Sequence, residues 1–304
     1  MNITQLSNNS LAELLLTTNN TRSSQYLNYQ PIHIIDGAAL YKTTVNGYNA
    51  YLQILNLRKL QIDQLIGNVN NLGLGEGKYY QGEGVGDSPF FEMKLFSQVN
   101  HQYQQLYKKQ LFSMINCAFF EQYKLSTQLS FPIKLDGQII TAGSSPYGPI
   151  SNPKHKFYRQ VQLKALVWND QEAYITDYNS TSGAPLNGAN VKNAIVSYQY
   201  SDHPAKVLAN NQINRYHVIS TLSENGVNSN MLLILTVKKA TLNQAAALLR
   251  DLGARSDIIT IDGGSSTYLF NSKVGNIMRP GSSYLNCGLI FRKLPHYLAF
   301  RTKD

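Results

Sequence analysis

The sequence predicts an α/β protein of mixed α+β type: one twisted mixed β-sheet assembly with β-hairpins, a βαβ unit near the C-terminus and flanking helices. Three pairs of apolar, alternating segments joined by short polar turns indicate antiparallel hairpins. Nearer the C-terminus a strand, an amphipathic helix and a second strand follow one another, which is typical of a βαβ crossover. No repeat or linker divides the chain, so we expect one domain over residues 31–304 after a loosely ordered segment, residues 1–30.

Composition narrows the class of protein. The 304 residues are 43% hydrophobic and 15% charged, as in globular rather than disordered chains. A net charge of +9 favours an acidic partner such as phosphate, a polyanionic glycan, nucleic acid or a membrane surface. The basic residues are scattered apart from a patch at residues 154–159, without zinc-finger spacing or an aromatic RNA-binding signature. We therefore expect no nucleic-acid partner. Nucleic-acid binding stays an alternative that only the net positive charge supports.

Membrane and thiol signals are sparse. No apolar run is long enough to span a membrane. The apolar patch at residues 11–16 contains Glu13 and lacks a preceding positive charge, unlike a signal peptide, so a cytoplasmic location is expected. Cys117 and Cys287 both lie in apolar runs, which indicates buried reduced thiols; a disulfide between them, near the site, is the alternative. Two cysteines also exclude a four-thiolate metal site.

The first half of the chain predicts a hairpin, a loop and a helix. Alternating segments at residues 41–45 and 48–57 flank Asn46-Gly47, a pair that adopts the positive φ values of a tight hairpin turn. Residues 67–89 hold many glycines but follow no clear strand, so a connector or a mobile loop is expected rather than a phosphate-cradling loop. Apolar residues from 95 to 111 then recur at helical spacing.

The second half predicts two further hairpins and the βαβ unit. The hairpins pair residues 161–168 with 172–177, and residues 215–222 with 231–237. After the last of these strands Thr241 is a suitable helix N-cap. Gly253 is placed to end that helix, and the next strand begins near residue 258. This order makes the two strands parallel and the crossover right-handed.

The strongest candidate site follows that last strand, in the polar run from Asp262 to Thr267. Its two glycines allow a tight turn and close approach of a ligand. Successive backbone N–H groups in such a turn can bind an anion. In βαβ units, ligands collect beyond the carboxyl ends of the strands, where Asp262 lies. The alternative is a Gly-Gly hairpin turn with polar neighbours.

Other candidate residues follow from burial and charge. Asn116 lies within an apolar strand, residues 112–120, and must hydrogen-bond either a loop of the protein or a ligand. Arg215 opens a strand and suits phosphate, because a guanidinium binds two oxygens at once. The six histidines are isolated in sequence and are expected to be surface or packing residues. Nucleophile-elbow, Walker and His-Glu-x-x-His motifs are absent. No cofactor is expected, and a divalent cation at the Asp262 loop stays open.

The loop at Asp262 resembles the motif of the phosphodiester glycosidase family, an apolar strand followed by Asp-Gly-Gly-x-Ser and then Ser or Thr. The matching residues are Asp262, Gly263, Gly264, Ser266 and Thr267. An upstream Asn-Gly-Gly-Phe-Phe motif with a following acidic residue is similar at Asn116, Phe119, Phe120 and Glu121. Cys117 and Ala118 replace its two glycines. Further similarity is found at Arg215, Arg279-Pro280 and Asn286, and the order of these motifs holds over residues 38–292.

The resemblance implies hydrolysis of a sugar joined through its anomeric carbon to a phosphate, as in N-acetylglucosamine-1-phosphodiesters. Its partner would be an anionic phosphorylated carbohydrate. Asp262 would be the general base or nucleophile and Glu121 a second carboxylate. The expected substrate-binding residues are Asn116, Arg215, Gly263, Gly264, Ser266, Thr267, Arg279 and Asn286. Since Cys117 and Ala118 add side chains where the family has glycines, a member that binds such a glycan without cleaving it is the alternative.

Overall fold

The computed structural model describes residues 11–17, 28–70, 88–120, 126–143, 161–203, 212–285 and 288–303. The protein is mostly β, with 49% strand and 14% helix, so the predicted α/β class is wrong. The predicted mixed sheet is also wrong, because every ladder among the described strands is antiparallel. The physical reason is that hairpins outnumber the single crossover, and each hairpin forces its strands to run antiparallel.

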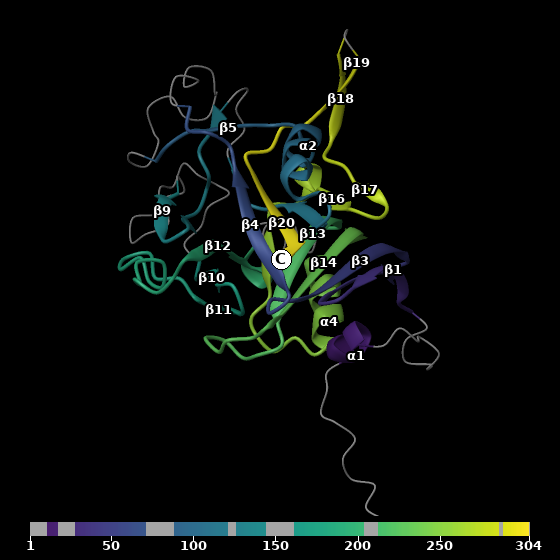
Figure 1. Ribbon diagram of the computed structural model, residues 1–304. Coiled ribbons are helices and arrows are strands. Elements are labelled where there is room, and N and C mark those ends of the chain that lie inside the picture. Colours follow the sequence, from purple (N-terminus) through teal and green to yellow (C-terminus); the bar gives the residue numbers. More distant parts are fainter. Residues whose placement is uncertain are drawn as a thin grey trace, which may run out of the picture.

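Two large sheets form the body of the protein (Figure 1). The larger sheet has 11 described strands. Nine of them follow one another in the spatial order β1 (Gln30–Ile35), β2 (Ala38–Val45), β3 (Tyr48–Asn56), β14 (Met231–Ala240), β13 (Asn214–Thr221), β15 (Ile259–Ile261), β12 (Asn193–Gln199), β10 (Leu163–Trp168) and β11 (Ala173–Asp177). The other two branch from this order: β8 (Ile133–Leu135) pairs with β12, and β9 (Gln138–Thr141) pairs with β8. The smaller has, in order, β17 (Gly275–Met278), β16 (Leu269–Asn271), β6 (Leu111–Asn116), β20 (His296–Thr302) and β4 (Leu60–Ile66).

Two short two-stranded sheets lie outside this body: β18 (Ser282–Leu285) with β19 (Gly288–Phe291), and β5 (Phe91–Glu92) with β7 (Ser126–Thr127). In Figure 1 the β18–β19 pair projects from the body.

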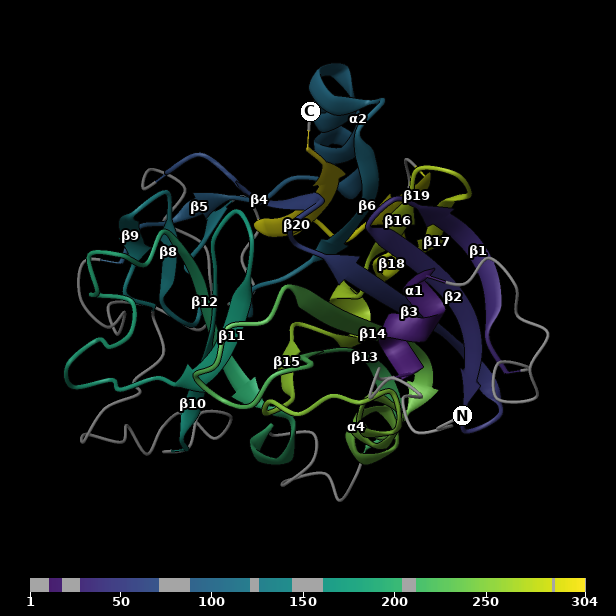
Figure 2. The same cartoon turned by 60° about the horizontal axis from the view of Figure 1, so that its bottom comes forward.

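The sheets and helices stack in four layers. One core fills the space between the two sheets. A second core lies between the outer face of the larger sheet and the helices α1 (Leu11–Thr17) and α4 (Leu242–Asp251). A third lies between the outer face of the smaller sheet and α2 (Phe96–Tyr107). Figure 2 shows α2 and α4 on opposite sides of the molecule, with both sheets between them.

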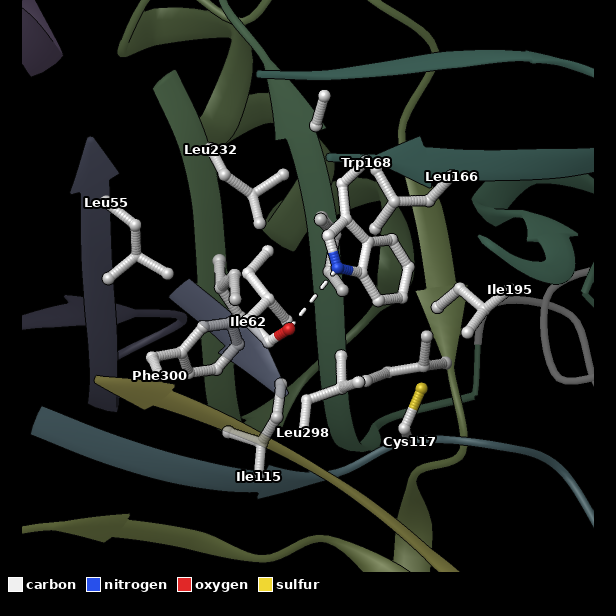
Figure 3. Close-up of a cluster of buried hydrophobic side chains, with 14 of the residues drawn as sticks. Leu55, Ile62, Ile115, Cys117, Leu166, Trp168, Ile195, Leu232, Leu298 and Phe300 are labelled. Carbon is white, nitrogen blue, oxygen red and sulfur yellow. Dashed lines mark hydrogen bonds between the residues drawn. The ribbon is translucent and has the colours of Figure 1, made fainter. Parts of the chain in front are cut away.

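The core between the sheets is apolar but contains a few polar ties. The Trp168 indole on β10 donates to the carbonyl of Ile62 on β4, with 3.4 Å between nitrogen and oxygen (Figure 3). Among the described strands β4 is at the edge of its sheet, so this carbonyl meets no ladder partner there. Ser113 of β6 donates across the same layer to the side chain of Gln53 on β3. Such hydrogen bonds fix how one sheet sits on the other.

The predicted hairpins and helices are present. Asn46 and Gly47 adopt φ values of 52° and 74°, as the turn between β2 and β3 requires. The hairpins β10–β11 and β13–β14 also form. Helix α4 begins as predicted, with Thr241 accepting from the Gln244 amide and the Gln244 side chain accepting from the Thr241 amide. Gly253 follows the helix with a φ of 100°.

The predicted βαβ unit exists, but its strands are not neighbours. Strand β13 lies between β14 and β15 and pairs antiparallel with both, so β14 and β15 run parallel to each other. The crossover through α4 therefore brings the end of β15, and the residues that follow it, beside the start of β13.

Some expectations concern the N-terminus and segments that are not described. A helix is present within residues 1–30 as α1, and it packs on the body: the Ala12 amide donates to the Leu252 carbonyl, and the Tyr41 hydroxyl to that of Leu15. Most of the glycine-rich stretch, residues 71–87, and the basic patch at 154–159 lie outside the described residues. The domain boundary at residue 31 stays a prediction. Every described helix is too short or too polar to cross a lipid bilayer.

The capping box of α4 gives a test of the local fold. Thr241→Ala removes the side-chain acceptor for the Gln244 amide, and we expect the free energy of unfolding to fall by about 1 kcal/mol in chemical denaturation. Thr241→Ser keeps the acceptor and should cost only a few tenths of that. Equal losses in the two variants would contradict the capping role.

Candidate functional site

The predicted site loop joins the two sheets. Residues 262–268 leave β15 in the larger sheet and enter β16 in the smaller one, passing through the short 3₁₀ turn η4 (Gly264–Ser266). The alternative of a Gly-Gly hairpin is therefore wrong, since the strands on either side belong to different sheets. The loop lies at the carboxyl end of β15, as expected.

Asn116 holds both ends of this loop. Strand β6 ends at Asn116, earlier than predicted, and the side chain is buried. Its Nδ2 donates to the backbone carbonyl of Asp262 at 2.7 Å, and its Oδ1 accepts from the backbone N–H of Tyr268 at 2.8 Å. Of the two roles expected for Asn116, tying down a loop is the one that these contacts perform.

A buried histidine supports the asparagine from the opposite sheet. The Nε2 atom of His217, on β13, lies 2.9 Å from Asn116 Oδ1. Its Nδ1 lies 2.8 Å from the hydroxyl of Thr236, on β14. Burial lowers the pKa of His217 to about 3, so the ring is neutral near pH 7. Sequence analysis missed this residue because its partners are 19 and 101 residues away along the chain.

The Asp262 carboxyl is half-buried and electrostatically unusual. Loss of water around it raises its pKa to about 7. Three weaker effects oppose that rise: a hydrogen bond from the Ser266 side chain, the positive charge of Arg292 and the backbone N–H of Gly263. The Asp262 amide also donates to the Cys117 carbonyl at 2.9 Å, so its backbone is held on both sides. Near neutral pH this carboxyl can both take up and release a proton.

Arg292 is the described arginine whose charge acts on Asp262, and sequence analysis did not select it. Its Nη1 donates to the Ser265 hydroxyl, and its guanidinium lies 5.2 Å from the centre of the Phe120 ring. Its backbone amide donates to Gly281 at 2.8 Å, which in turn donates to the Ser265 carbonyl at 2.7 Å. No local motif surrounds Arg292 in the sequence. Its position directly after an apolar segment was the one signal that its side chain is held in a defined position.

Arg215 and Arg279 lie on the rim of the loop. The Arg215 Nη1 donates to the backbone carbonyl of Arg279 at 3.1 Å. The Arg279 side chain is exposed and its guanidinium lies 6.0 Å from the Phe291 ring centre. Of these three arginines, Arg292 is the one whose charge acts on Asp262.

The glycines of the loop are required by close packing. A Cβ on Gly263 would lie 2.7 Å from the Arg215 carbonyl oxygen. Gly264 has a φ of 59°, in the left-handed region that favours glycine. The expected role of the Gly263 amide in holding phosphate competes with its hydrogen bond to the Asp262 carboxylate.

The remaining predicted residues are partly brought together. Ser266 is buried and touches Asp262, whereas Thr267 is buried and its hydroxyl has no hydrogen-bond partner among the described residues. Glu121, Asn286 and Cys287 lie outside the described residues, so their places in the site stay predictions.

The side chain that replaces a family glycine does not face the solvent. Cys117 is 1% exposed and its thiol points into the core between the sheets (Figure 3). Burial, and then the nearby Asp262 carboxylate, raise the pKa of this thiol well above its usual range. Cys117 is therefore a packing residue, as expected.

The cavity described for this protein lies away from the predicted site. A cavity of about 330 Å³ lies between α2, β4 and the segment before β20, and its lining includes none of the predicted site residues. Among the described histidines, cysteines and acidic residues, no group of three is arranged to hold a metal ion.

The packing of Gly263 predicts the effect of one methyl group. Gly263→Ala forces the Arg215 backbone to shift, and we expect a loss of about 1–3 kcal/mol in the free energy of unfolding. Gly275→Ala is a comparison without a steric clash: no atom lies within 4 Å of the added Cβ, and the loss of about 1–2 kcal/mol comes from its φ of 79°, a cost that Gly263, with a φ of −128°, does not share. Chemical denaturation measures both; a Gly263 variant as stable as the wild type would refute the close packing.

Comparisons with known proteins give only distant likenesses. No family model matches the chain, and no curated protein matches it. A hypothetical protein from Synechocystis is 12% identical with a TM-score of 0.46, over 90% of this chain and 64% of that one, so the chain spans less than two thirds of its length. The zebrafish N-acetylglucosamine-1-phosphodiester alpha-N-acetylglucosaminidase catalytic domain, auto-inhibited by its pro-peptide, is 11% identical with a TM-score of 0.48, over 91% of this chain and 85% of that one.

An exported protein from Burkholderia pseudomallei is 10% identical with a TM-score of 0.39, over 84% of this chain and 74% of that one. At these identities and TM-scores the comparisons assign the chain to no family.

Proposed function

We propose that the chain is a hydrolase that cleaves sugar-1-phosphodiesters, of the N-acetylglucosamine-1-phosphodiester type, at the bond between sugar and phosphate. The observation that carries the proposal is the Asp262 carboxyl, half-buried with a pKa of about 7 and placed beside the positive charge of Arg292. A proton acceptor next to a cation suits a reaction of water with an anionic substrate. The resemblance of the loop to the phosphodiester glycosidase motif gives the same substrate class.

Asp262 acts as the general base in this scheme. The oxygen of water attacks the anomeric carbon, and its proton passes to the Asp262 carboxylate. The bond between that carbon and the phosphate oxygen breaks, and its electron pair leaves with the phosphate. Ordinary glycosidases use a second carboxyl to protonate a poor leaving group. A phosphate monoester leaves without that help, so Glu121 has the lesser role of a second carboxylate.

The arginines supply the other half of the site. Arg292 touches the loop through Ser265, and Arg215 and Arg279 are joined at its rim. Each guanidinium group can bind two phosphate oxygens at once. The three positive charges of these arginines outweigh the single negative charge of the Asp262 carboxylate. An anion held there would rest beside Asp262. The alternative, a protein that binds the glycan without cleaving it, rests on the extra side chains that replace two glycines. Cys117 gives that alternative little support, since its thiol lies in the core rather than over the loop.

The direct test is turnover of a panel of sugar-1-phosphodiesters, set beside equilibrium binding of the same compounds. Asp262→Asn removes the proton acceptor but keeps the shape, and we expect kcat to fall by about 10²- to 10⁴-fold with binding retained. Because the base must be ionised, wild-type kcat should rise with pH through about 7. Asp36→Asn is the control, as this carboxylate is exposed and pairs with Lys59 at the surface.

Three outcomes separate the alternatives. Normal turnover by the Asp262→Asn variant would refute the assignment of the base. Binding without turnover by the wild type would support a member that binds the glycan and does not cleave it. Water labelled with heavy oxygen locates the broken bond: label in the sugar supports attack at carbon, and label in the phosphate contradicts it.

Arg292→Gln should raise KM more than it lowers kcat, because the charge that holds phosphate is lost.

A further inference from the structure

His217 lies in the apolar core between the sheets, directly beneath the site loop. It is fully buried, and on its own sheet it stands opposite Thr236 on one side and Ile261 on the other. Ile219 and Ile261, its neighbours on that face, belong to the core between the sheets. An imidazole buried among such residues loses its hydration, which is costly unless both nitrogens find partners.

The hydrogen bonds around His217 determine where its proton lies. The Tyr268 N–H can only donate, so the Asn116 atom that it meets is the oxygen, Oδ1. His217 Nε2 lies 2.9 Å from that oxygen and must therefore carry the proton and donate it. In the neutral ring Nδ1 is then an acceptor, and the Thr236 hydroxyl donates to it. Every donor along this chain meets an acceptor.

This chain of hydrogen bonds ends on the residue that carries the chemistry. Thr236 and His217 belong to the larger sheet and Asn116 to the smaller one, so the bond from His217 to Asn116 crosses between the sheets. Asn116 then holds the Asp262 carbonyl and the Tyr268 amide. Its Oδ1 accepts twice, which occupies both lone pairs and restricts rotation of the carboxamide.

We propose that His217, with its proton fixed on Nε2 by the Asn116 oxygen, is a positioning residue that acts through Asn116 to hold the Asp262 loop between the two sheets. The loop's rigidity follows from the hydrogen bonds alone. The effect on turnover rests on the proposed function. His217 touches no reacting atom and exchanges no proton with Asp262.

The experiment compares two variants of His217 with a matched control and a reserve variant. His217→Leu removes both nitrogens at similar size, whereas His217→Gln can place an amide N–H near the position of Nε2. Ser220→Ala is the matched control, because it deletes another buried hydrogen bond of β13, to Ser256, away from the loop. Thr236→Val, which removes the donor to Nδ1, serves if the leucine variant does not fold. Thermal unfolding first establishes how much each variant loses in stability.

The local readout is hydrogen exchange of the Tyr268 amide, measured by NMR. We expect His217→Leu, or Thr236→Val in its place, to speed this exchange about three- to tenfold, the equivalent of one lost hydrogen bond. His217→Gln should restore the slow rate, and Ser220→Ala should leave it unchanged. Unchanged exchange in the leucine and valine variants would overturn the proposal, whether or not the protein turns over any sugar phosphodiester.

The readout on function is the split between kcat and KM on a substrate that the wild type cleaves. We expect His217→Leu to lower kcat with KM nearly unchanged, because the arginines that hold phosphate stay in place. His217→Gln should recover most of kcat. An equal loss of kcat in the Ser220→Ala control would overturn the positioning role, since it would show an effect of stability alone.

Discussion

The Asn116 carboxamide donates one hydrogen bond to the Asp262 carbonyl and accepts another from the Tyr268 amide. These two bonds hold the segment that crosses from the larger sheet to the smaller one, and the rest of the site depends on them. The crossing segment leaves one sheet after Ile261 and joins the other at Leu269, and its further anchors are the Cys117 carbonyl, the Gly281 amide and the Arg292 side chain. His217, on the larger sheet, hydrogen-bonds Asn116, on the smaller sheet, and so links the asparagine to both sheets. The hydrogen bond from Trp168 to Ile62 elsewhere in the same layer has the same consequence: each sheet fixes the place of the other.

Burial of Asp262 brings a stability cost together with a chemical property. A carboxylate with a pKa of about 7 is less stable in the ionised form than it would be in water. The cost to the folded protein grows as the pH rises from 3.8, the ordinary value, to about 7 and is complete above that. Hydrogen bonds from Ser266 and Gly263 and the charge of Arg292 reduce the cost without removing it. The result is a proton acceptor that is poised near physiological pH, which an exposed aspartate would not be.

Local structure could be predicted from the sequence where local chemistry decides it. Asn46-Gly47 specifies its hairpin turn, and Thr241 with Gly253 bounds α4. The fold class could not be predicted, because alternation along a strand shows that one face is buried but not which sheet the strand joins. The Asp262 loop was found because its residues are consecutive. Arg292, directly after β19, and His217, on β13, were missed because each comes close to the loop or to Asn116 only when distant segments of the chain pack together.

The central claim is that the loop between the sheets presents a carboxyl that titrates near neutral pH. The most direct measurement is the titration of the Asp262 carboxyl carbon by ¹³C NMR, with the resonance assigned from its absence in the Asp262→Asn variant. A midpoint of about 7 is predicted from the burial of the carboxyl. A midpoint of about 4, the ordinary value for aspartate, would contradict the account.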